Sequence, residues 1–161
     1  MSNKETNDRN YMHVETISFD PGGTTGVAIK YDTGKIEVRQ LGPYKHHETL
    51  WRVLEKKNPV GIVYERFVYQ RRELSSGVSL NLQACEYIGV IELWASMHGI
   101  NPVQQGASEV KKFCTEDKMK VWGFDLPHAQ RHAKDALRHL VFYETFVGKD
   151  KTWLLKLRDQ L

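Results

Sequence analysis

The sequence lacks the features that mark secreted proteins, zinc proteins with thiolate ligands and membrane proteins. Its two cysteines, Cys85 and Cys114, lie far apart and lack the spacing of a zinc site. No run approaches the roughly 20 apolar residues that cross a bilayer. The N-terminal stretch MSNKETNDRNYMH lacks the apolar centre of a signal peptide. We therefore expect reduced thiols, no membrane association and a cytoplasmic location, in the host cell if the protein is viral.

A strong charge of one sign is also missing. The formal net charge is +3 and the pI is about 8.8, which is only weak support for a nucleic-acid partner. Hydrophobic residues make up 40% and charged residues 27% of the 161 positions, a composition typical of one globular domain. Residues 1–12 are polar and aperiodic, so we predict a disordered arm there and a single domain over residues 13–161.

Strand and helix patterns alternate along the chain. Apolar and β-branched runs predict strands, and apolar residues at helical spacing predict helices, the last of them an amphipathic C-terminal segment. An Asp-Thr-Gly turn joins the second and third strands. The pattern predicts an α/β fold, with a central mixed five-stranded sheet whose first three strands are antiparallel, flanked by helices. The expected strands are 14–19, 25–31, 35–41, 60–64 and 102–105, and the expected helices are 48–57, 79–98, 108–114, 128–146 and 153–161.

Two of these strands end on a carboxylate. Asp20 follows the apolar run ISF and precedes Pro-Gly-Gly, and Glu65 closes the run VGIVY. Ligands gather where strands of such sheets deliver their carboxyl ends, so two acids at that edge favour a functional site. The alternatives are a turn-capping role for Asp20 and an ion pair of Glu65 with Arg66 or Arg71.

A third element lies in the last long helix, in the sequence HAKDAL. His132 and Asp135 are three residues apart and therefore lie on one helix face. The alternative is that Asp135 forms an ion pair with Arg131 or Arg138 while His132 lies at the surface.

Three carboxylates and a histidine that converge repel one another unless a cation holds them. Oxygen ligands select a hard ion such as Mg²⁺ or Mn²⁺. Two such ions, roughly 3.5–4 Å apart, direct water onto a phosphodiester in two-metal sites. We predict two ions held by Asp20, Glu65, His132 and Asp135, with Asp20 between them.

Residues beside these acids suit DNA. The segment RFVYQRRE follows Glu65 directly and interleaves arginines, which neutralise phosphates, with aromatic rings, which stack on bases. Thr24 and Thr25 offer hydroxyl or amide contacts to a phosphate. The alternative for the RFVYQRRE segment is a solvated loop. The predicted DNA contacts are Thr24, Thr25, Arg66, Phe67, Tyr69, Arg71 and Arg72.

The order of DPGGTTG, the strand-end YE, LNLQACEYIGV and HAKDAL resembles the RuvC branch of the RNase H-like nucleases, which comprises Holliday junction resolvases. The resemblance runs from Ile17 to Tyr143 and suggests a bacteriophage relative. It implies an RNase H-like fold and a structure-selective endodeoxyribonuclease that resolves four-way junctions. It places the four site acids and bases of the family on Asp20, Glu65, His132 and Asp135.

The resemblance also implies a lysine near the phosphate, for which Lys118 and Lys120 are the candidates. It implies a homodimer, with helix 79–98 and its Gly89 as the dimer helix. A core helix in which Gly89 allows close packing on the sheet is the competing interpretation.

Three other functions stay open from the sequence. A nuclease of the same mechanism could act on flaps, forks or RNA–DNA hybrids. The protein could instead be a relative of these nucleases that kept the fold and binds nucleic acid without cutting it. DPGGTTG also approaches the phosphate loop of actin-like ATP-binding domains, but the chain has no second glycine-rich loop to complete one.

Overall fold

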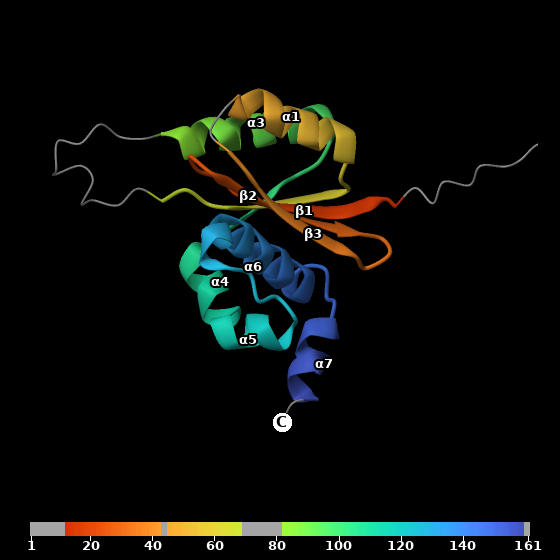
Figure 1. The fold of residues 1–161 in the computed structure, drawn as a ribbon. Helices are drawn as coiled ribbons and strands as arrows, with labels where there is room; N and C mark the ends of the chain where they lie inside the picture. The colour runs from red at the N-terminus through yellow and green to blue at the C-terminus, as the bar shows by residue number, and fades with distance from the viewer. Residues whose placement is uncertain (1–11, 43–44, 69–81, 160–161) are drawn as a thin grey trace, which may run out of the picture.

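The computed structural model describes residues 12–42, 45–68 and 82–159, which form a sheet covered by helices on both faces (Figure 1). The strands are β1 (Val14–Asp20), β2 (Thr25–Tyr31), β3 (Ile36–Leu41), β4 (Gly61–Glu65) and β5 (Val103–Gln105). The helices are α1 (His46–Lys57), α3 (Gln83–Met97), α4 (Ala107–Phe113), α5 (Glu116–Val121), α6 (Arg131–Phe146) and α7 (Thr152–Arg158), with a 3-10 turn at His128–Gln130.

The five strands are ordered β3-β2-β1-β4-β5. β1, β2 and β3 pair antiparallel, whereas β4 lies parallel to β1 and β5 lies parallel to β4. The turn between β2 and β3 places Gly34 at φ 79°, a conformation that glycine adopts without steric cost. The predicted mixed sheet with three antiparallel strands at one edge is confirmed.

Each face of the sheet has its own core (Figure 1). On the face of α1 and α3, alternate β1 residues Ile17 and Phe19 pack with Leu50 and Trp94, all fully buried. On the other face α6 packs across the sheet, and Ala136 and Leu140 join a second cluster with Trp122 and Trp153. The period-two alternation of β1 therefore leaves Thr16, Ser18 and Asp20 facing α6.

The structure corrects two details of the expected helices. The segment after Cys114, expected as a loop, contains α5, whose first turn is capped by Thr115 accepting a hydrogen bond from the Lys118 backbone N–H. The last long helix begins at Arg131, after the 3-10 turn, and not at His128. The start of α5 could have been predicted from Thr115, because threonine is a preferred N-cap residue.

Helix α3 buries Tyr87, Ile91, Trp94 and Ala95 in the core that it shares with α1 and the sheet. Gly89 lies on the exposed side, and a Cβ atom added there would meet nothing within 4 Å. Close packing on the sheet therefore does not explain Gly89, and that interpretation of the glycine is corrected.

The predicted N-terminal arm, apart from Met12, lies outside the described residues, as do Tyr69, Arg71 and Arg72. In the described part of the chain, both cysteines are unpaired. No helix among these residues has the length and apolar character of a membrane span.

Candidate active site

Three neighbouring parallel strands end on polar side chains at one edge of the sheet. Asp20 is the last residue of β1, and Glu65 is the last residue of the adjacent β4. Gln105 ends β5 and pairs directly with Glu65. Asp20 and Gln105 are buried, and Glu65 is half-buried. The register of β1 and β4 therefore brings the two predicted strand-end acids together.

Helix α6 lies over this edge. His132 Nδ1 is 2.8 Å from Asp20 Oδ2, and His139 Nε2 is 3.0 Å from Glu65 Oε2. Asp135 comes from the same helix face, one turn after His132. The four predicted site residues therefore converge from β1, β4 and α6, and His139 joins them.

Asp135 is held by two cations. Its Oδ1 accepts a hydrogen bond of 2.6 Å from Arg138, and its Oδ2 lies 3.0 Å from Lys111 Nζ. The ion pair with Arg138 is the one that the structural alternative expected. The same alternative placed His132 at the surface. This part is wrong, because His132 is half-buried and bonded to Asp20.

The surroundings of Asp20 disfavour the ionised form of its carboxyl. Burial is the main cause that raises the pKa of the Asp20 carboxyl to about 6, and the charge of Glu65 is the next. Asp135 raises this pKa slightly, while the hydrogen bond from His132 lowers it. A buried carboxylate among other acids is stabilised by a cation, so the electrostatics favour metal binding.

A row of polar side chains sets the position of α6 on the sheet. Ser18 Oγ donates to the Ala136 carbonyl at 2.8 Å, and Thr16 Oγ1 donates to Glu144 Oε1 at 2.8 Å. With the Asp20–His132 bond, every residue of β1 that faces α6 from Thr16 onward is bonded to that helix. This row places His132 and Asp135 over the ends of the strands.

Gly26 permits the close approach. It pairs with Asp20 across β1 and β2, and a Cβ atom added at Gly26 would lie 1.8 Å from the His132 carbonyl oxygen. Only glycine leaves room for the first turn of α6 at this position.

Gln40 of β3 forms hydrogen bonds with backbone groups at the start of α6. Its Oε1 accepts a hydrogen bond from the His132 backbone N–H at 3.0 Å, and its Nε2 donates to the Ala129 carbonyl at 3.0 Å. The first N–H groups of a helix have no partner within it, so Gln40 acts as a cap supplied by another element.

The Thr25 hydroxyl stabilises the DPGGTTG loop through contacts within the loop. Thr25 is fully buried, and its Oγ1 contacts both Gly22 N and Gly22 O as well as His46 Nε2 at 2.7 Å. The predicted phosphate contact by the Thr25 hydroxyl is therefore corrected, because this hydroxyl braces the loop. Thr24 is more accessible and lines a cavity of about 250 Å³ beside His132.

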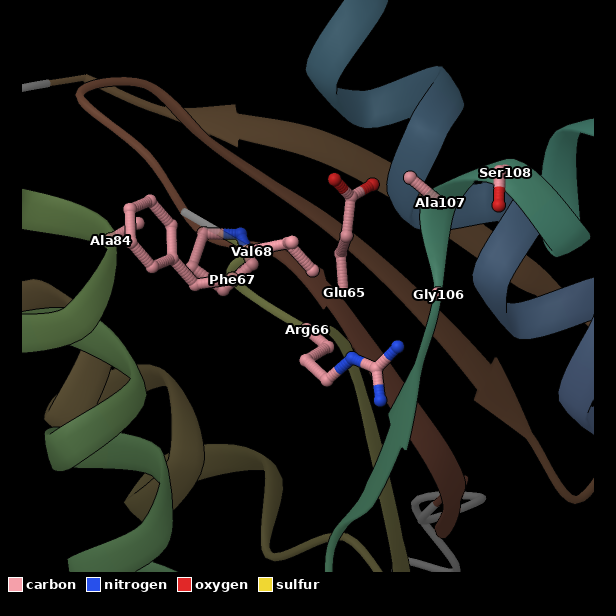
Figure 2. Close-up of a pocket in the computed structure, with 9 residues that line it drawn as sticks. Glu65, Arg66, Phe67, Val68, Ala84, Gly106, Ala107 and Ser108 are labelled. Carbon is pink, nitrogen blue, oxygen red and sulfur yellow. The ribbon is translucent and has the colours of Figure 1, made fainter. Parts of the chain in front are cut away.

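A cavity of about 560 Å³ opens beside Glu65 (Figure 2). Arg66 and Phe67, two of the residues proposed to contact DNA, lie in its wall. Figure 2 shows the Glu65 carboxylate and the Arg66 guanidinium extending in opposite directions. Glu65 Oε2 contacts His139 Nε2 at 3.0 Å, and the described residues show no ion pair between Glu65 and Arg66. The remaining wall consists of Pro21, Val68, Ala84, Gly106, Ala107 and Ser108.

The donor set fits a hard divalent cation, although the side chains are engaged with one another. Three carboxylates and an imidazole are the ligands that Mg²⁺ or Mn²⁺ accepts in such sites. Over residues 12–42, 45–68 and 82–159, no three His, Cys, Asp or Glu side chains already form a metal-binding group. Asp20, Glu65 and Asp135 would have to exchange a protein partner for the metal.

Neither candidate phosphate lysine has a described ion pair with these acids. Lys118 Nζ sits 4.8 Å from the centre of the Phe113 ring, and Lys120 is exposed at the end of α5. Lys111, which was not a predicted site residue, contacts Asp135.

Sequence reasoning also missed His139, Gln105 and Gln40. His139 was detectable, because it follows His132 by seven residues and Asp135 by four and so shares their helix face. Gln105 ends a parallel strand just as Asp20 and Glu65 do. Nothing local marks Gln40, whose role depends on the placement of α6.

Comparisons with known proteins identify the fold. No protein-family model matches the sequence, and no curated protein matches it. RuvC of Thermus thermophilus in complex with a Holliday junction substrate is similar in structure, with a TM-score of 0.56 and 20% identity over 83% of this chain and 95% of that one. A second Thermus thermophilus RuvC structure gives a TM-score of 0.54 and 16% identity over 81% and 95%. The chain thus has the RuvC-like form of the RNase H-like fold, as its resemblance implied.

Proposed function

We propose that this protein is a metal-dependent endonuclease that cuts branched DNA, with the four-way Holliday junction as its substrate. One observation carries the proposal: Asp20 and Glu65 end adjacent parallel strands, and α6 sets His132 and Asp135 over them. The similarity in fold to RuvC, one structure of which holds a Holliday junction substrate, supports the choice of DNA.

Each residue of the site has a distinct task in this proposal. When bound, two Mg²⁺ or Mn²⁺ ions supply an activated water and stabilise the leaving oxygen. Asp20 lies between the His132 side and the Glu65 side of the site, so it is the natural shared ligand. Glu65 serves one side, and Asp135 and His132 serve the other, with His132 able to hold either a metal or the attacking water.

The surroundings of the acids provide a seat for the DNA strand. The cavity beside Glu65 presents the Arg66 guanidinium and the Phe67 ring, which suit a phosphate and a base. Lys111 Nζ lies 3.0 Å from Asp135 Oδ2, so its ammonium is a candidate contact for the scissile phosphate.

A homodimer completes the proposal, because two sites are needed to cut two strands of a junction. Helix α3 and its N-cap residue Leu82 support it with exposed apolar side chains: Leu82, Leu93 and Met97 are 43%, 57% and 67% exposed. These residues and Gly89 lie on one side of the helix, which also carries the exposed Glu86, and Gly89 would let a second helix approach closely.

The decisive experiment compares the wild-type protein with Asp20→Asn on a mobile four-way junction, a flap, a fork and an RNA–DNA hybrid, with Mg²⁺ or Mn²⁺. We expect paired symmetric cuts in the junction by the wild type, and a loss of cleavage of at least 10³-fold in the variant with junction binding retained. Asp32→Asn, in the turn at the far end of the sheet, is the control and should cut normally.

Cleavage that survives Asp20→Asn or excess chelator would contradict the mechanism. Preferential cutting of the flap, fork or hybrid would keep the mechanism and replace the substrate. Binding of the junction by the wild type without a cut in either metal would indicate a DNA-binding protein that lacks the chemistry.

A further inference from the structure

The buried histidine His139 has no part in the proposed function so far. Its side chain is 1% exposed, on the face of α6 that carries His132 and Asp135. Both ring nitrogens contact a side chain at a strand end: Nε2 lies 3.0 Å from Glu65 Oε2, and Nδ1 lies 2.8 Å from Gln105 Oε1. The imidazole therefore bridges the ends of β4 and β5.

The geometry of this bridge comes from the sheet itself. Glu65 and Gln105 are partners in the parallel ladder, and the next backbone bond, from Arg66 N to Gln105 O at 2.8 Å, continues it. Two side chains at paired positions on one face of a sheet lie side by side. One imidazole can therefore reach both of them, and its ring is fixed at both nitrogens.

The hydrogen on Nε2 points at Glu65. A carboxylate only accepts hydrogen bonds, so the ring nitrogen that faces Glu65 is the donor. Gln105 is buried, and its Nε2 has no partner within the described residues. Turning this amide over lets Nε2 donate to His139 Nδ1, which satisfies the buried donor and places the ring hydrogen on Nε2.

We propose that His139 is a positioning residue for Glu65: it holds Oε2, leaves Oε1 to face the metal, and so strengthens divalent-cation binding on the Glu65 side of the site. Outer hydrogen-bond partners orient metal ligands in this way, and their loss typically weakens metal binding by roughly 10- to 100-fold. This inference rests on the proposed role of Glu65 as a metal ligand.

A buried histidine can also serve only to fill the core, and the near-isosteric amides distinguish the two roles. His139→Gln places an amide N–H near the position of Nε2 and keeps the bond to Glu65. His139→Asn places one near Nδ1 and keeps only the contact with Gln105. A packing role predicts that both variants behave alike, whereas a positioning role predicts that glutamine rescues and asparagine does not.

The experiment measures Mn²⁺ binding to the full chain without DNA, by the electron paramagnetic resonance signal of the free ion. We expect His139→Asn and His139→Leu to weaken Mn²⁺ binding by about 10-fold or more, and His139→Gln to stay within about threefold of the wild type. In a Glu65→Gln background, His139→Asn should have little further effect, because the two changes remove the same interaction. Thermal unfolding checks that each variant is folded, and the asparagine–glutamine comparison remains valid if the leucine variant is not.

The outcomes separate this inference from the proposed function. Mn²⁺ binding that is unchanged in His139→Asn, or a loss that persists in full without Glu65, overturns the role of His139 while leaving junction cleavage intact. A wild-type protein that binds no Mn²⁺ overturns it as well. A wild-type protein that binds Mn²⁺ as described but cuts no DNA overturns the proposed function and leaves the His139–Glu65 coupling in place.

Discussion

At the scale of single residues, the protonation state of Asp20 that suits the stability of the metal-free fold differs from the one that suits the proposed function. It is buried, its carboxyl faces the charges of Glu65 and Asp135, and its one described hydrogen bond comes from His132. These surroundings disfavour the ionised form, which is the form that binds a metal. The metal-free fold is therefore strained at the position where the proposed chemistry requires charge.

Removing this charge should stabilise the metal-free protein. The folded-state pKa of Asp20 is raised from 3.8 to about 6, so protonated Asp20 contributes stability that is fully present below pH 3.8 and is lost as pH rises through about 6. Asp20→Asn avoids that loss, which is on the order of 3 kcal/mol at about 1.4 kcal/mol per pKa unit. We expect its Tm at pH 8 in chelator to exceed that of the wild type by roughly 6–12 °C.

The pH dependence provides the check. Thermal unfolding from pH 4 to pH 8 should show the advantage of Asp20→Asn growing with pH and vanishing near pH 4. Asp32→Asn, which changes an exposed carboxylate, should follow the wild type throughout. Parallel curves for Asp20→Asn and the wild type would show that neither burial nor the neighbouring acids raise the pKa of Asp20 in the folded protein.

At the scale of elements, the site depends on where α6 lies on the sheet. Ser18, Asp20 and Gln40 are bonded to its N-terminal half, and Gly26 allows its backbone to touch β2. A shift of this helix by one turn would move His132 and Asp135 about 5.4 Å from the strand ends. The packing of α6 is therefore as important for the site as the acids themselves.

Gly26→Ala tests this dependence. The new Cβ atom would lie 1.8 Å from the His132 carbonyl oxygen, which is backbone and cannot rotate away. We expect a loss of stability of about 1–3 kcal/mol, measured by chemical denaturation, and the loss of cleavage and of Mn²⁺ binding.

Gly22→Ala is the matched control within the same DPGGTTG loop. Its Cβ atom would come no nearer than 3.4 Å to a neighbour, the Thr24 carbonyl oxygen, so stability should be unchanged within about 0.5 kcal/mol. Equal destabilisation by the two alanines would mean that the loop, and not the contact with α6, is sensitive to the substitution.

The sequence was sufficient for the order and type of most elements and for selecting four candidate residues that the fold brings together. Asp20 and Glu65 were predictable because strand-end acids interrupt apolar runs, and His132 and Asp135 because helical spacing puts them on one face. The row of Thr16, Ser18 and Asp20 was hidden inside what reads as an apolar strand. The roles of Gln40, Gly26 and Lys111 depend on contacts between elements distant in the chain, which no local pattern encodes.

At the scale of the whole molecule, the two faces of the sheet serve different purposes. Helix α6 lies on the face that builds the candidate site, and α1 and α3 cover the other face (Figure 1). Helix α3 there carries exposed apolar side chains. A four-way junction has two strands to cut, and a two-fold symmetric dimer presents two equivalent sites to it. An apolar helix face without a covering element in the described chain is a reasonable place for that two-fold axis.

A charge placed on that face should separate the two subunits. In Leu93→Lys or Met97→Lys, the dimer would bring two like charges together across its axis, so we expect a monomer at micromolar concentration by analytical ultracentrifugation. Val60→Lys is the control, because Val60 is 78% exposed but lies outside α3, and it should leave the dimer intact.

Since each subunit keeps its own acids, the monomeric variants should still nick DNA, but the paired cuts in the junction should become single, uncoordinated ones. A wild-type monomer that makes paired cuts, or a Leu93→Lys variant that stays dimeric, would place the subunit contact on another surface.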